Sequence, residues 1–500
     1  MPIGNSARRS ATPRRGRRLW TEWPALLALA AILTCGVTAC GTAASAHNAA
    51  LRVPVYGLPG HLDPGILDPA RASAATPLWL ASMFNSGLVK FSPDLHVIPE
   101  LAVSIPTIST DGRSYTFTIR QDARFADGSH CTARAVAYSF ARALGPRTGS
   151  ALARSYLGGI VGADAVEAGL TTDLSGVQIV HRLTVRIRLA APDATFLEKL
   201  AFPVADIVEP STGMAGESPS GLGPWSIAFR HSDGSVTALP RRHYYGAPIQ
   251  LKEIRLLPAA DSRRALELYR QNLVDVAQVP RQDFRGYSTR SDFVSGQALD
   301  AYYALPTGPG RTLLAASLDR STLATALGSA ATPLSGIVPP AIPDYAGSDS
   351  PATAPGSDAS RRPPAVQLVG VPGGDALGRT VRGALLRQWT VRSHATTRVF
   401  LVHAGFALPD PGVWLRIVLL QTRSSWYRSM LAQANALTND PVSRMSDYET
   451  VESWALQQGL VIPLASGVNG YVIRSSVENL QLTPLGPMPE NNNWSLVATS

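Results

Sequence analysis

The chain of 500 residues carries 45 Lys and Arg against 36 Asp and Glu, a formal net charge of +9, and 45% of it is hydrophobic. This composition is ordinary for a globular protein, and the length allows two or three domains with cores of their own. The first 40 residues hold six Arg and one Glu, so the rest keeps 39 basic and 35 acidic residues, a net of about +4. So weak a bias does not indicate nucleic-acid binding.

The N-terminus has the pattern of an export signal. Arginines within positions 8–18 precede an apolar run over 23–37, and this run leads into Val37-Thr38-Ala39-Cys40-Gly41. Small residues before a Cys resemble a bacterial lipobox, in which cleavage precedes the Cys and its thiol carries a diacylglyceryl group. We therefore predict a lipoprotein signal peptide over 1–40, lipidation of Cys40 and a flexible tether over 41–50.

Two other readings of this segment stay open. The alternatives to lipidation are a plain signal peptide cut near residues 44–46, and an uncleaved membrane anchor. The apolar run is short for a helix that spans a bilayer, which argues against the anchor. The sequence does not decide between the general secretory and the twin-arginine export routes.

Of the three cysteines, only Cys131 lies beyond the signal and the predicted lipid site. A lone thiol forms neither an internal disulfide nor a Cys-rich metal centre. We expect Cys131 to be a packing residue just ahead of a helix.

Residues 111–144 predict a strand, a turn and a helix. Tyr115, Phe117 and Ile119 alternate with polar residues, as in a half-buried strand. An Asp-Gly pair at 127–128 then indicates a turn, and apolar residues at helical spacing predict a helix over 132–144. Residues 183–189 alternate in the same manner and predict a second strand.

The same stretch resembles a known family. Asp111-Gly112, Tyr115-Thr116-Phe117 and Phe125-Ala126-Asp127-Gly128 resemble a sequence block of the family 5 solute-binding proteins, the extracytoplasmic receptors of peptide, dipeptide and nickel ABC importers. Further family motifs are matched by Leu-Asp-Pro at 62–64 and 67–69, by Val97-Ile98-Pro99-Glu100-Leu101-Ala102, by Gly221-Leu222-Gly223-Pro224-Trp225 and by residues 266–279. In the last of these Asp275 is kept, whereas the usual Gly is replaced near Asn272.

The resemblance implies an α/β fold of the two-lobe, periplasmic-binding-protein-like type (class II), with an extra α+β subdomain inserted in lobe I and a ligand cleft between the lobes. Lobe I is expected to combine 51–75, 200–259 and 470–500, with 76–199 as the inserted subdomain and 260–469 as lobe II. Hinge crossings are expected near 258–261 and 466–470.

Within the expected lobe II, residues 346–364 are rich in Gly, Ser, Ala, Pro and Asp without an apolar period, which predicts a disordered linker. We expect Asp319 and Arg320 to cap a helix and form a surface ion pair. We predict helices over 377–389, 425–437 and 443–458, and strands over 366–369 and 398–402. The resemblance to the family implies a helix pair over 311–327 and terminal strands over 461–464 and 470–473.

The resemblance also implies where a ligand is held. Peptide-binding relatives carry a G-W-x-x-D-x-x-D-P segment whose Asp pairs with the peptide α-ammonium, because a buried cation needs a compensating charge. The corresponding run here, Gly405-Phe406-Ala407-Leu408-Pro409-Asp410-Pro411, is two residues shorter and keeps one Asp. Asp410 either binds the amine or only holds the turn before Pro411.

The other ligand candidates are chosen by family position. Aromatic residues near such a cleft form its wall or the core more often than they make specific contacts. The candidates besides Asp410 are Phe406, Trp414, Phe84, Asn85 and Trp225.

The resemblance therefore implies a monomeric, lipid-anchored receptor on the outer face of the cytoplasmic membrane. It would bind an oligopeptide or similar small solute and deliver it to an ABC permease driven by a cytoplasmic ATPase. We expect no catalysis, cofactor or metal, because the sequence contains no Walker-type loop, no Gly-x-Ser-x-Gly elbow, no His-Glu-x-x-His and no nucleophile–base set. The alternative is a degenerate relative with a structural or regulatory role in the cell envelope, which the shortened 405–411 loop and the linker at 346–364 motivate.

Overall fold

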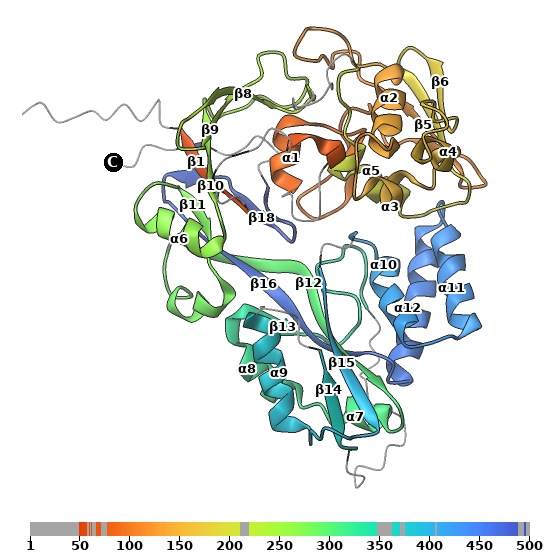
Figure 1. Cartoon of the computed structure of the whole chain (residues 1–500), viewed down its shortest axis with the longest axis vertical. Helices are drawn as coiled ribbons and strands as arrows, with labels where there is room; N and C mark the ends of the chain where they lie inside the picture. Colours follow the sequence, from red (N-terminus) through yellow and green to blue (C-terminus); the bar gives the residue numbers. More distant parts are fainter. Residues whose placement is uncertain are drawn as a thin grey trace, which may run out of the picture. The chain divides into compact units, whose positions relative to one another are not determined.

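The computed structural model describes residues 50–57, 60, 62, 67–71, 78–210, 220–347, 363–370, 376–405, 408–488 and 495–496 (Figure 1). The predicted signal peptide, Cys40, Phe406 and the central part of the 346–364 linker lie outside these ranges.

A mixed sheet carries the first strand of the described chain. Its order is β1-β10-β9-β8, with β1 parallel to β10 and the other neighbours antiparallel. Helix α1 packs against this sheet, and Met83 shares a core with Val53 and Leu256. These elements are β1 (Leu51–Tyr56), α1 (Leu78–Phe84), β8 (Trp225–Arg230), β9 (Val236–Pro240) and β10 (Ile254–Ala259).

An antiparallel sheet of order β4-β5-β7-β6 forms between α1 and β8 in the chain. The predicted strand is confirmed, because β5 buries Tyr115 and Phe117 and pairs with β7. The predicted helix is confirmed as α2, with Cys131 buried just before it. The elements of this segment are β2 (Val89–Phe91), β3 (Val97–Pro99), β4 (Thr107–Ile108), β5 (Ser114–Thr118), α2 (Ala133–Leu144), α3 (Ala153–Leu157), α4 (Ala163–Glu167), β6 (Val177–His181), β7 (Thr184–Arg188) and α5 (Phe196–Leu200).

The Leu-Asp-Pro motif at 67–69 ties this segment to the chain ahead of it. The buried Asp68 carboxylate accepts two hydrogen bonds from the Arg142 guanidinium, at 2.9 and 2.6 Å, and a third from the Ala70 amide. Bidentate pairing of this kind fixes the orientation of both groups. The motif therefore anchors α2 through its last turn.

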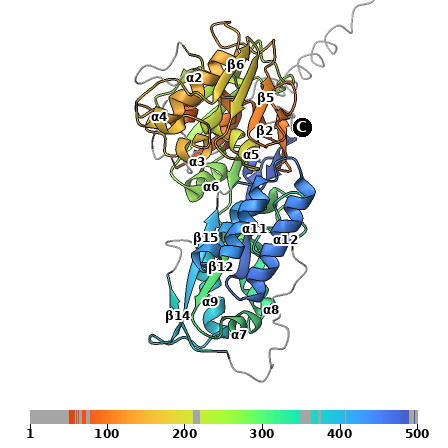
Figure 2. The same cartoon turned by 90° about the vertical axis from the view of Figure 1, so that its right-hand side faces the viewer.

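A larger sheet, of order β11-β16-β12-β15-β14 with β13 paired to β16, holds most of the remaining chain (Figures 1 and 2). Because side chains alternate across a strand, β12 serves two cores. Tyr302 and Ala304 join a core with α8 and α9, whereas Tyr303 and Leu305 join a core with α11 and α12. The sheet is thus covered by helices on both faces.

The elements of this part are as follows in chain order. They are α6 (Ser262–Arg270), β11 (Val276–Gln278), β12 (Phe293–Thr307), α7 (Arg311–Ala316), α8 (Arg320–Leu327), β13 (Ala331–Pro333), β14 (Val366–Val369), α9 (Ala376–Gln388), β15 (Thr397–Gly405), α10 (Pro411–Leu415), α11 (Ser425–Ala436), α12 (Pro441–Gln457), β16 (Ile462–Ile473), β17 (Val477–Glu478), β18 (Gln481–Thr483), β19 (Gly486–Met488) and β20 (Ser495–Leu496).

Most of the predicted elements in this part are confirmed, with two differences. The two terminal strands predicted over 461–464 and 470–473 are one strand, β16, because the polar stretch between them pairs with β12 and β13. Asp319 caps α8 as expected, but Arg320 donates to the carbonyl oxygens of Leu334 and Pro463 and does not form the surface ion pair that we expected.

The replaced glycine near residue 272 has a conformational explanation. Asn272 has a φ of 58°, in the left-handed region that Gly adopts freely and Asn tolerates best among other residues. The turn leads to Asp275, whose buried carboxylate accepts hydrogen bonds from the Arg52 amide at 2.8 Å and from its guanidinium at 2.6 Å. Asn272 therefore adopts the backbone conformation that a Gly at this position would allow.

Candidate functional site

The end of α1 is held against the segment that leads into β8. The Asn85 amide donates to the carbonyl oxygens of Leu67 at 3.1 Å and Ala81 at 3.3 Å, and only 1% of this residue is exposed. The Gly223 amide donates to the Phe84 carbonyl at 3.0 Å. The buried Asn85 side chain therefore holds the backbone at the end of α1 through hydrogen bonds to two carbonyl groups.

The two glycines of Gly221-Leu222-Gly223-Pro224-Trp225 are required by this contact. A Cβ atom on Gly223 would lie 2.6 Å from the Asn85 nitrogen and 2.6 Å from the Met83 oxygen, far inside contact distance. A Cβ on Gly221 would collide with the side chain of Asn85. The motif is thus explained by the close approach of two backbones.

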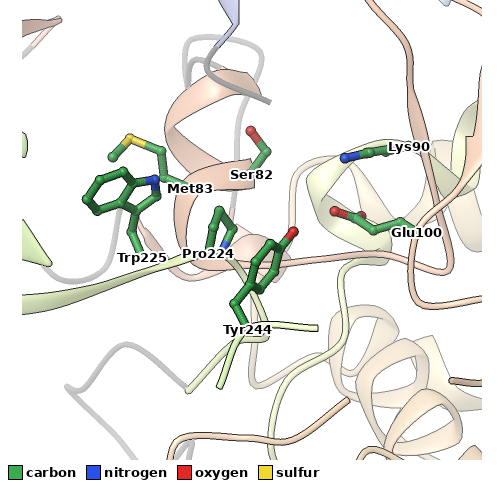
Figure 3. Close-up of a pocket in the computed structure, with 7 residues that line it drawn as sticks. All are labelled: Ser82, Met83, Lys90, Glu100, Pro224, Trp225 and Tyr244. Carbon is green, nitrogen blue, oxygen red and sulfur yellow. The ribbon is translucent and has the colours of Figure 1, made fainter. Parts of the chain in front are cut away.

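A pocket opens beside this contact, between α1, β2, β3 and the start of β8 (Figure 3). Met83, Pro224 and Trp225 form its apolar side, and the polar groups of Lys90 and Glu100 lie on the other. Its cavity volume of about 10 Å³ is close to the room that one water molecule needs, far below that of a small-molecule site. The remaining lining residues are Ser82 and Tyr244.

Glu100 is the acidic residue of this pocket. It is 9% exposed, and its carboxylate accepts a hydrogen bond from the Gly87 amide at 3.0 Å. Burial raises the pKa of the Glu100 carboxyl, and the Lys90 ammonium opposes that rise. The pocket therefore has one acidic and one basic side chain on the side opposite Trp225.

Asp410 lies elsewhere, at the start of α10. Its carboxylate caps the helix by accepting from the Gly412 amide at 2.8 Å, and the residue is 1% exposed. The Tyr448 hydroxyl donates to the same oxygen at 3.3 Å. Of the two roles open from the sequence, holding the turn before Pro411 is the one seen here, and binding of an amine stays a prediction.

Asp410 also belongs to a buried charged cluster. The second oxygen of its carboxylate lies 3.9 Å from the nearest Arg444 nitrogen, and Glu198 of α5 interacts with both residues. Burial raises the pKa of Asp410, and burial followed by the Asp410 charge raises the pKa of Glu198 to about 8. The Glu198 carboxyl group is consequently prone to hold a proton at neutral pH.

The predicted ligand residues thus occupy two places. Phe84, Asn85 and Trp225 lie at the contact of α1 with β8, and Trp225 lines the pocket. Asp410 and Trp414 lie on α10, where the Trp414 indole donates to the Leu408 carbonyl at 3.3 Å. Phe406 lies outside the described residues.

The sequence did not indicate four polar residues near these places, namely Glu100 and Lys90 at the pocket and Glu198 and Arg444 near Asp410. Glu100 lies inside the family motif Val97-Ile98-Pro99-Glu100-Leu101-Ala102, and this motif is the signal that could have identified it. Glu198 and Arg444 carry no local signal, because their partners are distant in the chain.

None of the helices in the described ranges combines the length and apolar character needed to cross a bilayer. Nor do the described residues bring three or more His, Cys, Asp or Glu side chains into a group that could hold a metal ion.

The fold and sequence define a two-lobe solute-binding protein. Residues 96–361 match the bacterial extracellular solute-binding proteins, family 5 (middle region), which is more than half of the chain. The chain therefore belongs to this family. Its fold matches that of the murein tripeptide-binding protein MppA in the unliganded open form with a TM-score of 0.76 and 20% identity, over 90% of this chain and 98% of that one. The expected α/β two-lobe fold is thus confirmed.

Two curated relatives are similar in sequence. The chain is 30% identical over 202 residues to the periplasmic murein peptide-binding protein MppA of Escherichia coli, covering 38% of this chain and 37% of that protein. It is 25% identical over 360 residues to the glutathione-binding protein GsiB of Salmonella typhimurium, covering 68% and 64%. The matched stretches span less than two thirds of the length of either relative.

Proposed function

We propose that this chain is the extracytoplasmic receptor of an ABC importer. It binds an oligopeptide or similar small solute in a cleft between its lobes, and lobe closure presents the solute to the membrane permease. The lobes follow the division expected from the sequence, and a lipid on Cys40 holds the monomer at the outer face of the cytoplasmic membrane. The observation that carries the proposal is the family match over residues 96–361.

A peptide is favoured over other solutes. The two relatives described above are a murein peptide-binding and a glutathione-binding protein. Asp410, Phe406, Trp414, Phe84, Asn85 and Trp225 remain the proposed ligand residues.

Addition of a pool of tri- and tetrapeptides, or of glutathione, is expected to raise the melting temperature of the purified protein. A ligand that binds only the folded state stabilises it by about 2.7 kcal/mol at a concentration of 100 Kd. Scanning fluorimetry measures the shift, with nickel chloride as a separate probe for the metal-binding branch of the family. If no probe changes the melting temperature, the receptor proposal is wrong and the degenerate envelope lipoprotein is supported.

Asp410→Asn is expected to weaken peptide binding at least tenfold while leaving α10 capped. The Asn oxygen still accepts from the Gly412 amide, whereas the charge that would pair with an ammonium is lost. Asp440→Asn is the matched control, because Asp440 also precedes a Pro and caps a helix, α12, at an exposed position. Titration by calorimetry measures both. Equal affinity of Asp410→Asn and the wild type would rule out the ammonium role.

A further inference from the structure

One face of the sheet β4-β5-β7-β6 lies at the surface of the protein. On the opposite face, Tyr115 and Phe117 of β5 and Val185 and Ile187 of β7 are buried in one core with residues of α2. Because side chains alternate along a strand, the residues between them point the other way. These outward side chains are exposed or half-buried.

The pairing of the strands fixes which side chains are neighbours on this outer face. Arg186 of β7 lies between Thr116 of β5 and Gln178 of β6, and Arg188 lies opposite Ser114. Outward positions that follow each other along a strand are about 6.6 Å apart, so the two Arg side chains start from neighbouring positions. The outer face consists of Thr107, Ser114, Thr116, Thr118, Gln178, His181, Thr184, Arg186 and Arg188.

The outer face is basic. The four strands contain Arg186, Arg188 and His181 but no Asp or Glu. Within the described part of the chain, neither of these two Arg side chains forms an ion pair with a carboxylate. Their positive charges are therefore available to an anionic partner.

The turns that join these strands add to this charge. Arg182 lies exposed between β6 and β7, and Arg113 lies exposed just before β5. The turn between β4 and β5 also holds Asp111, whose carboxylate accepts from the Ser109 hydroxyl at 2.5 Å and from the Arg113 amide at 3.1 Å. Segments 107–118 and 177–188 together carry four Arg and one Asp, a net charge of +3. Charge complementarity thus favours an anionic surface as the partner.

The edge strand β6 exposes aliphatic side chains beside the outer face. Ile179 is 50% exposed and Val180 is 37% exposed. Edge strands usually carry charged residues instead, because an apolar edge invites pairing with other chains. Basic groups next to exposed aliphatic groups suit the surface of an anionic bilayer, where phosphates attract the cations and the acyl boundary accepts the apolar groups.

We propose that the outer face of this sheet docks on the anionic phospholipid surface of the membrane. Arg186 and Arg188 pair with lipid phosphates, and the hydroxyl groups of Thr116 and Ser114 beside them donate further hydrogen bonds. The inference rests on the proposed function in one respect, namely that the chain works at the outer face of a membrane. Such docking would orient the protein on the bilayer, which a flexible lipid tether alone does not do.

Hydrogen exchange of the full chain, as its host processes it, tests this docking on vesicles of phosphatidylglycerol and of phosphatidylcholine. The amides of β6 and of residues 107–118 are expected to exchange more slowly on the anionic vesicles only, and the slowing should fade as salt is added. Each Arg near an anionic surface adds about fivefold to the affinity, so Arg186→Gln/Arg188→Gln is expected to lose about 25-fold and with it the slowing.

The matched control is Arg423→Gln/Arg428→Gln, which removes the same charge from two exposed positions before and within α11. It should keep the slowing seen in the wild type. Because all four positions are exposed, both double variants are expected to keep the melting temperature of the wild type within about 0.5 kcal/mol of stability.

Three results would overturn the lipid surface as the partner. They are unchanged exchange on both kinds of vesicle, equal slowing on both, and slowing that appears only when a membrane protein is added to the vesicles. Failure of the receptor proposal looks different, since it shows as no ligand-dependent rise of the melting temperature in solution. Loss of the docking proposal leaves that rise in place.

Discussion

Replacing Glu452 by Ala is expected to lower the free energy of unfolding by about 3–5 kcal/mol, the loss typical when a buried, hydrogen-bonded charge network is broken. The Glu452 side chain is fully buried on α12. One carboxylate oxygen accepts from the amides of Ile337 at 2.5 Å and Val338 at 3.1 Å, and the other accepts from the Tyr345 hydroxyl at 2.6 Å. Truncation leaves two buried amides without this acceptor and opens a cavity.

Urea unfolding followed by tryptophan fluorescence measures the loss as a lower midpoint at an unchanged slope. Glu452→Gln keeps one carbonyl oxygen and is expected to lose less than the Ala variant. Thr450→Ala, at an exposed position of the same helix, is the control and should change stability by no more than about 0.5 kcal/mol. A loss below about 1 kcal/mol in Glu452→Ala would show that water replaces the carboxylate at residues 337–338.

Local sequence patterns were sufficient to predict the helices and strands that are determined by neighbouring residues in the chain. The strand and helix over 114–144 follow from alternation, turn pairs and helical spacing, all of which act within a few residues. The same holds for α11 and α12. The family motifs predicted the fold. The structure then explains what these motifs do, as with the Asp68–Arg142 pair and the close backbone contact at glycines 221 and 223.

Contacts between segments that are distant in the chain could not be predicted from the sequence. Nothing near Glu198 shows that Asp410 and Arg444 lie beside it, because the three come from α5, α10 and α12. Likewise, the polar run inside β16 reads as a break between two strands until its pairing with β12 and β13 is known. The burial of Asp410 could not be predicted from its neighbours in the chain either. An Asp-Pro pair caps α10 in the interior, and another Asp-Pro pair caps α12 at the surface.

Replacing Gly223 by Ala is expected to destabilise the protein by about 3 kcal/mol, at the upper end of the range for overpacking, because the neighbouring atoms belong to backbone and cannot rotate away. The new Cβ would meet the Asn85 nitrogen and the Met83 oxygen at 2.6 Å, at the end of α1. Separation of the two segments would also weaken the Gly223 hydrogen bond to Phe84.

The same change reaches the proposed site. Met83 and Trp225 line the pocket from the two segments that Gly223 holds together, so their separation alters the apolar side of that pocket. Gly159→Ala is the matched control, because a Cβ there meets no atom within 4 Å. Urea midpoints and peptide-dependent melting shifts are measured for both variants. If Gly223→Ala retains wild-type stability, the close approach of α1 and the 221–225 segment is not what restricts this position to glycine. If it loses stability but keeps wild-type peptide affinity, the pocket beside Trp225 is not part of the ligand site.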